Sequence, residues 1–158
     1  MRKSFLAALA AAAVMTSAHG AAAKPVAEGG VTVEEFRQWL EDNGYKAQIE
    51  VEKDGAKHVN SASDGLKFSV YFYDCKKDRC ASIEYYVGFD KSDDTPSLEK
   101  INTWNREKRF LKAYLNDKGD AGFEYDDSVS PGGTWESIED SFNVFLSFLP
   151  EVKKFVNW

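Results

Sequence analysis

The sequence is poor in the residues that most catalytic and metal sites require. It holds two cysteines and two histidines among 158 residues, and only His58 lies beyond the first 23. Most acid–base chemistry and any Ser-His-Asp arrangement would therefore have to run through His58. The chain has no glycine-rich phosphate-binding motif, and its acidic turn at 116–120 lacks the residue order of a calcium loop. We therefore expect a non-enzymatic protein without metal or cofactor.

No apolar run in the chain is long enough to cross a bilayer. The run from Phe5 to Met15 has about half of the roughly 20 residues that a membrane helix needs. Two basic residues precede it and small residues follow it, which is typical of a secretory signal peptide. We expect residues 1–23 to be this signal peptide, cut between Ala23 and Lys24 or, as the alternative, after Gly20. The predicted location is the bacterial periplasm or the medium, without stable membrane insertion.

Positive charge is scarce in the rest of the chain. Removing residues 1–23 takes away two basic residues and no acid, which leaves 18 basic against 26 acidic side chains and a net charge of −8. Such a chain is repelled by nucleic acid and by anionic lipid. The aromatic content of 14% argues for a packed core rather than disorder. Residues 24–30 are polar and rich in glycine and proline, so we expect a flexible lead-in to one domain at 31–158.

Three segments have apolar residues at helical spacing. The first begins at Thr32, which has Glu35 three residues later as in a capping box. The second is predicted from Thr95, because the following proline suits a first helical position, to about Arg109. The third is predicted from about Thr134, with a kink or a break near Phe148 caused by Pro150.

Alternating apolar and polar residues, separated by turns of the Asp-Gly type, predict four strands before the second helix and two after it. The predicted order is α-β-β-β-β-α-β-β-α. Hairpins that are segregated from helices in this way indicate an α+β fold, with an antiparallel sheet flanked by helices.

Cys75 and Cys80 lie near the tip of the predicted central hairpin. If they face each other, the numbers of paired residues sum to 155, and one face of the hairpin becomes apolar. A slip of one residue would place polar side chains against this apolar set. The register therefore favours a structural disulfide. A redox pair is less consistent with the four-residue spacing, and a metal site lacks ligands. The predicted apolar pairs are Phe72–Ile83, Val70–Tyr85, Phe68–Val87 and Leu66–Phe89.

Two groups of residues are candidates for binding a partner. The second face of the central hairpin carries three tyrosines, which are common at interfaces. A helix that covers this face is the alternative. The segment "INTWNREKRF" carries the other group. The alternative for this segment is a structural role, in which the helix docks through its tryptophan and hydrogen-bonds neighbouring loops through asparagine. The candidate residues are Tyr71, Tyr73, Tyr86, Trp104, Asn105 and Arg109.

The segments "SASDGLKFSVYFYDCKKDRCASIEYYVGF" and "PSLEKINTWNREKRFLKAYLNDKGD" resemble the YbjN-domain family, which is also labelled a putative bacterial sensory transduction regulator family. The resemblance runs from about Val31 to Val156. It implies a fold similar to type III secretion chaperones and brings no catalytic residues. Secretion chaperones act in the cytosol, whereas this chain carries an export signal. What the resemblance still implies is a capacity to bind another polypeptide.

These observations predict an exported protein-interaction module with an unidentified protein partner, a regulatory or stress-related role and no affinity for nucleic acid. A homodimer is compatible with the sequence. The alternative hypothesis is a periplasmic protein that binds a small ligand or a glycan through exposed aromatic side chains.

Overall fold

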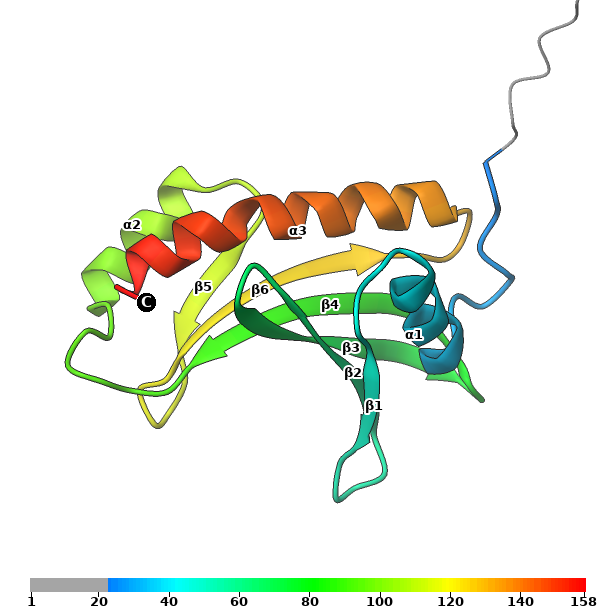
Figure 1. The fold of residues 1–158 in the computed structure, drawn as a ribbon, viewed down its shortest axis with the longest axis horizontal. Coiled ribbons are helices and arrows are strands. Elements are labelled where there is room, and N and C mark those ends of the chain that lie inside the picture. Colours follow the sequence, from blue (N-terminus) through cyan, green and yellow to red (C-terminus); the bar gives the residue numbers. More distant parts are fainter. Residues whose placement is uncertain (1–22) are drawn as a thin grey trace, which may run out of the picture.

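The computed structural model describes residues 23–158, so the predicted signal peptide lies outside the described residues except for Ala23. The described residues form three helices and one sheet, whose arrangement is shown in Figure 1. The order of elements is the predicted one, and the α+β fold class is confirmed. In chain order the elements are α1 (Val33–Asp42), β1 (Gln48–Val51), β2 (Lys57–Ser63), β3 (Leu66–Lys76), β4 (Arg79–Phe89), α2 (Leu98–Glu107), β5 (Lys112–Leu115), β6 (Ala121–Ser128) and α3 (Trp135–Phe155).

The six strands form one antiparallel sheet in the order β1-β2-β3-β4-β6-β5. All three helices pack on the same face of this sheet. Phe36 of α1 and Phe142 of α3 both contact Tyr85 of β4, and Trp104 of α2 contacts Phe123 of β6. The apolar core therefore lies between the sheet and one layer of helices, with α3 running along the sheet (Figure 1).

The register of the central hairpin is the predicted one from Ser69–Tyr86 to Lys76–Arg79, so paired residues sum to 155. Val70 and Tyr85 are fully buried as a result. Two predicted pairs, Phe68–Val87 and Leu66–Phe89, do not form, because β3 and β4 separate before Ser69. The first residues of β3 pair with β2 alone, and there Phe68 packs against the aromatic rings of α3.

The helix boundaries agree with the sequence at α1 and differ at α2. Thr32 caps α1 in the predicted capping box, where its side chain accepts from Glu35 N at 3.0 Å. The prediction that the second helix begins at Thr95 is wrong. Ser97 caps α2 instead, and the Thr95 hydroxyl accepts a hydrogen bond from the Ser92 N–H. A residue before proline avoids the helical conformation, and the cap falls after Pro96.

The third helix continues through Pro150 without a break. Proline removes one helical hydrogen bond, which is why a break was expected. Leu149 and Val152, on either side of it, are buried in the core, and this packing holds the helix together. No helix within residues 23–158 is both long enough and apolar enough to cross a membrane.

Residues 24–30, for which the sequence predicts a flexible lead-in, contact the rest of the domain. The Val26 N–H donates to Gly133 O at 2.9 Å, and the Val26 side chain packs against the core. Val31 pairs with Cys80 through two backbone hydrogen bonds. Gly30 makes this close approach possible: a Cβ atom on it would lie 1.8 Å from the Cys80 carbonyl oxygen, and its φ is +105°. We call residues 24–31 the N-terminal strap.

Helix α2 closes the β5 edge of the sheet through two side chains. Trp104 is buried, and its ring N–H donates to Leu111 O at 2.8 Å. The Asn105 side chain accepts from Ala113 N at 2.8 Å and donates to Ala113 O at 2.9 Å. The amide of Asn105 thus pairs with the backbone of β5 as a neighbouring strand would. An unpaired strand edge is a site for aggregation, and this contact covers part of it.

Replacing Asn105 by alanine should therefore lower the free energy of unfolding by about 1–3 kcal/mol, because both backbone groups of Ala113 lose their partner. Urea unfolding measures the change. Asn102→Ala is the matched control, since Asn102 is an exposed residue of the same helix. Equal effects of the two substitutions would contradict this role of Asn105.

Candidate functional site: the open face of the sheet

The face of the sheet opposite the helices carries a group of tyrosines and acidic residues from four strands. Strand pairing brings them together: Tyr86 of β4 lies opposite Glu124 of β6, and Glu84 opposite Asp126. We call this group the open face. It consists of Tyr71 and Tyr73 on β3, Glu84 and Tyr86 on β4, Lys112 and Tyr114 on β5, and Glu124 and Asp126 on β6.

The three predicted tyrosines all lie on the open face. The rings of Tyr71 and Tyr86 meet edge to face, with centroids 5.9 Å apart. Tyr73 is the most accessible, with 46% of its surface exposed. The alternative, that a helix covers this face, does not hold for residues 23–158, because their three helices pack on the other side. Burial raises the pKa of Tyr73 to about 12, so its hydroxyl remains a hydrogen-bond donor at neutral pH.

Two glycines leave room for the side chains of Tyr86 and Tyr114. Gly88 and Gly122 lie opposite each other on β4 and β6. A Cβ atom on Gly88 would lie 2.3 Å from the Tyr86 hydroxyl, and one on Gly122 would lie 2.7 Å from the ring of Tyr114. Both rings therefore lie flat over a glycine. A glycine inside a strand commonly marks such a close approach.

Three carboxylates meet beside the tyrosines. One oxygen each of Glu84, Glu124 and Asp126 lies within 4.8 Å of the others. Glu124 is buried and forms an ion pair with Lys112. Burial, and then the charges of Glu124 and Asp126, raise the pKa of the Glu84 carboxyl to about 7. The open face therefore holds more negative charge than its one lysine neutralises.

The same three carboxylates are oxygen donors of the kind that Ca²⁺ or Mg²⁺ prefers. However, the ammonium group of Lys112 already occupies Glu124. A cation at this site would have to displace or tolerate Lys112. An acidic cluster without further ligands does not by itself establish a metal site, and we assign none.

His58 of β2 is buried. Only 5% of its surface is exposed. Its ring lies 5.0 Å from that of Tyr71, and its Nδ1 lies 3.3 Å from a carboxylate oxygen of Glu52. Ser61 is three residues further along the same strand and points to the opposite face. The histidine and this serine therefore cannot form a catalytic pair.

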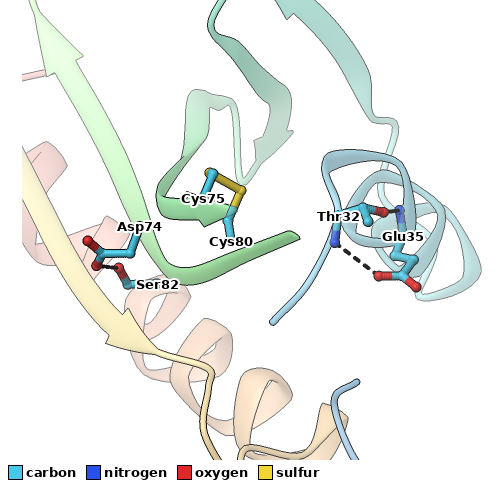
Figure 2. The surroundings of a disulfide bond; sticks show 6 residues. All are labelled: Thr32, Glu35, Asp74, Cys75, Cys80 and Ser82. Atoms are coloured by element: carbon cyan, nitrogen blue, oxygen red, sulfur yellow. Dashed lines mark hydrogen bonds between the residues drawn. A yellow bond between two sulfur atoms is a disulfide. The ribbon is translucent and has the colours of Figure 1, made fainter. Parts of the chain in front are cut away.

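The cysteine pair lies at the tip of the central hairpin, away from the carboxylates. Cys75 and Cys80 are register partners, and their sulfur atoms lie 2.11 Å apart. Figure 2 shows this pair between the Asp74–Ser82 hydrogen bond and the capping box of α1. Cys80 is buried under the N-terminal strap, whereas Cys75 is exposed. The pair therefore lies at the point where the hairpin and the strap meet.

The second predicted group of partner-binding residues has a structural role instead. Trp104 is 4% exposed and donates to Leu111 O, and both polar groups of the Asn105 amide are hydrogen-bonded to β5. Arg109 is exposed, with its guanidinium group 5.1 Å from the ring centroid of Phe110. The structure does not bring these residues to the open face. Helix docking, the alternative interpretation of this segment, describes Trp104 and Asn105 correctly.

Four residues of the open face are not among the predicted site residues: Glu84, Tyr114, Glu124 and Asp126. The last two reach the site because β6 pairs with β4, and 31 residues separate the end of β4 from the start of β6. No local pattern encodes that register. The available signal was Gly88 and Gly122, which lie beside aromatic residues in segments that the sequence predicts as strands.

Three comparisons with known proteins place the chain. Residues 32–152 match the family model described as "YbjN: Putative bacterial sensory transduction regulator". Among solved structures the fold matches the crystal structure of YbjN, described as "a putative transcription regulator from E. coli", with a TM-score of 0.55 and 18% sequence identity. That match covers 80% of this chain and 89% of the other. No curated protein matches the sequence.

The raised pKa of Glu84 predicts a pH-dependent stability. The folded state holds the Glu84 proton up to about pH 7, whereas the unfolded state releases it near 4.5. Ionised Glu84 therefore costs stability, and this cost grows as the pH rises from 4.5 to 7. Glu84→Gln should raise the free energy of unfolding at pH 8 by about 1–2 kcal/mol, after allowance for solvent screening, and have little effect below 4.5.

Urea unfolding at both pH values measures this difference. The control is Glu139→Gln, which replaces an exposed carboxylate in the second turn of α3. A Glu84→Gln effect that does not change with pH would contradict the raised pKa of Glu84.

Proposed function

This chain belongs to the YbjN family, and from that premise we propose that it is an exported, non-enzymatic interaction module that binds a cationic segment of another protein on the open face. The single observation that supports the proposal is the open face itself. There Tyr71, Tyr73, Tyr86 and Tyr114 surround Glu84, Glu124 and Asp126.

The chemistry of the open face suits lysine and arginine side chains. Tyrosine rings attract cations through their faces, and tyrosines provide large contact areas with a polar tip. A lysine or arginine placed between Glu84 and Asp126 would relieve the repulsion that raises the Glu84 pKa. Binding would thus recover part of the stability that the crowded carboxylates cost.

A second copy of the chain is a poor occupant of this face. In a symmetric dimer the same patch meets itself, so the Glu84, Glu124 and Asp126 clusters would face one another. Like charges juxtaposed across an interface cost several kcal/mol. A homodimer of this protein would therefore form through another surface.

Regulation through a protein contact fits the charge of the chain better than contact with nucleic acid. The family is described as a sensory transduction regulator and the E. coli neighbour as a transcription regulator. Without residues 1–23 this chain has 18 basic and 26 acidic side chains. Such a surface repels the phosphate backbone. The proposed regulatory step is therefore recognition of a polypeptide.

The absence of enzymatic activity is part of the proposal. The family description names a regulator and no reaction. Within residues 23–158, His58 is buried between Glu52 and Tyr71 and faces away from Ser61. The pKa of Glu84 is raised by burial and by the neighbouring acids of the open face, which we propose to be a binding surface.

Export and oxidation of the cysteine pair also belong to the proposal. The signal-peptide pattern of residues 1–23 supports export, and disulfides persist in the periplasm. The positions of Cys75 and Cys80 as register partners support a structural bond. Such a bond across a short loop adds roughly 2 kcal/mol to stability in the chain-entropy model.

Thiol labelling tests export and oxidation together. Protein isolated from the periplasm and denatured without reductant should bind no thiol-alkylating reagent, and after reduction it should bind two equivalents, one per cysteine. A chain made in the cytosol without residues 1–23 is the control and should be labelled without reduction. Labelling of both cysteines in the periplasmic protein would refute the structural disulfide.

Photo-crosslinking tests the partner site. A photoreactive phenylalanine analogue at Tyr73 should form an adduct with a protein partner in living cells. The same analogue at Leu98, which is 71% exposed on α2, should not. Asp126→Lys should reduce the Tyr73 adduct at least about fivefold, because it places a cation where the partner's cation binds. Glu139→Lys makes the same charge change outside the open face and should leave the adduct intact.

Two outcomes would contradict the proposal. Equal adducts at Tyr73 and Leu98, or an adduct unaffected by Asp126→Lys, would remove the open face as the partner site. No adduct at Tyr73, together with thermal stabilisation by cell-wall fragments, would favour the alternative of a small-ligand or glycan-binding protein. A ligand at 100 times its dissociation constant adds about 2.7 kcal/mol of stability.

A further inference from the structure

The N-terminal strap brings the backbone nitrogen of Lys24 to a carboxylate. Lys24 N donates to Glu136 Oε1 at 2.9 Å, and Trp135 N donates to Lys24 O at 2.9 Å. Pro25 pairs with Thr134, the N-cap residue of α3. The start of the strap is thus held by both backbone and side-chain groups of the first turn of α3.

We infer that the mature chain begins at Lys24 and that its new α-ammonium group forms an ion pair with Glu136. This inference uses the export proposed above only to explain why the chain is cut. Signal-peptide removal is a hydrolysis: the bond between Ala23 C and Lys24 N breaks and one water is consumed. Ala23 keeps a carboxylate, and Lys24 N becomes an ammonium group at neutral pH.

The geometry turns an ordinary amide hydrogen bond into a charged one. In the uncut chain Lys24 N has one proton and no charge. After cleavage the same atom has three protons and a positive charge, 2.9 Å from the Glu136 carboxylate in the present geometry. Charge-assisted hydrogen bonds are stronger than neutral ones. Contact with Lys24 N already holds the pKa of Glu136 below its usual range, so the acid is ionised at neutral pH.

The position of the cut decides whether this pair forms. A cut after Gly20 would leave Ala21 as the first residue, and Lys24 N would remain an amide. The free ammonium would then lie on Ala21, three residues upstream of Lys24. The ion pair therefore requires the cut after Ala23 and would be absent after a cut at Gly20.

Neighbouring charges would affect the same ammonium. Acidic residues of α1 line the groove beside Lys24, and two of them already have partners: Glu35 pairs with Arg79, and Glu34 with Arg37. The remaining acid in this groove is Asp42. The side-chain ammonium of Lys24 lies 5.5 Å from the ring centroid of Trp135. Glu136 is thus the carboxylate in direct contact.

A double-mutant cycle tests the ion pair with purified proteins, whatever their natural compartment. Proteins that begin at Lys24 and at Ala21 are prepared from a cleavable fusion, each with Glu136 and with Glu136→Gln. At about pH 6.5 the substitution should lower the folding equilibrium constant of the Lys24 protein roughly two- to fivefold more than that of the Ala21 protein. Glu139→Gln is the control and should affect both proteins equally.

The pH dependence gives an independent readout. Contact with Glu136 raises the folded-state pKa of the α-ammonium above its unfolded value, so the contribution is complete below the unfolded pKa and is lost as the pH rises through the folded one. The difference between the two proteins should therefore be full at about pH 6.5 and largely gone at about pH 9.5, since the ordinary α-amino pKa is about 7.7–8.0. An equal effect of Glu136→Gln in both proteins would overturn the ion pair.

Intact mass of the protein from the periplasm separates this inference from the proposal of export. A chain that starts at Lys24 supports both. A chain that starts at Ala21 overturns the inference and leaves export standing. A chain that retains its first residues in the cytosol refutes export and the natural cut, whereas the double-mutant cycle still reports on the ion pair.

Discussion

The pairing of β3 with β4 determines both surfaces on which this protein depends. One register brings Val70 opposite Tyr85 in the core, and the same register brings Tyr71 opposite Glu84 on the open face. Because strand side chains alternate, a slip of one residue would exchange the two faces and bury the acids. Cys75 and Cys80 pair in this register at the hairpin tip. The core and the proposed partner site therefore cannot change independently of each other.

Local contacts made much of this fold predictable. The capping box at Thr32 and the register of β3 with β4 both involve residues that are close in the sequence. The structure has both. Contacts between distant segments were not predictable in the same way. The strap packs because α3 and Cys80 supply backbone partners that its own composition does not reveal. In the same way Glu124 and Asp126 reach the open face only through the pairing of β6 with β4.

The segment around Trp104 shows how a conspicuous sequence can have a structural role. Asparagine and tryptophan on one short helix suggest recognition, since both are common in binding sites. Here the strand that needs them is β5, which has four residues and lies at the edge of the sheet. Trp104 anchors the helix, and Asn105 supplies the hydrogen bonds of a missing strand. β6 is its one neighbour in the sheet, and these side chains add to the hydrogen bonds that β6 supplies.

The crowded acids of the open face lower the stability of the folded protein, which a purely structural surface would avoid. Glu84 has a pKa of about 7 because it is partly buried beside Glu124 and Asp126. Replacing such a residue by a neutral one would remove the repulsion without disturbing the apolar face. Destabilising groups of this kind are common where a protein binds something, because the partner supplies the missing opposite charge. Lys112 forms its ion pair with Glu124, so Glu84 and Asp126 are the acids of the open face that a cationic partner would pair with.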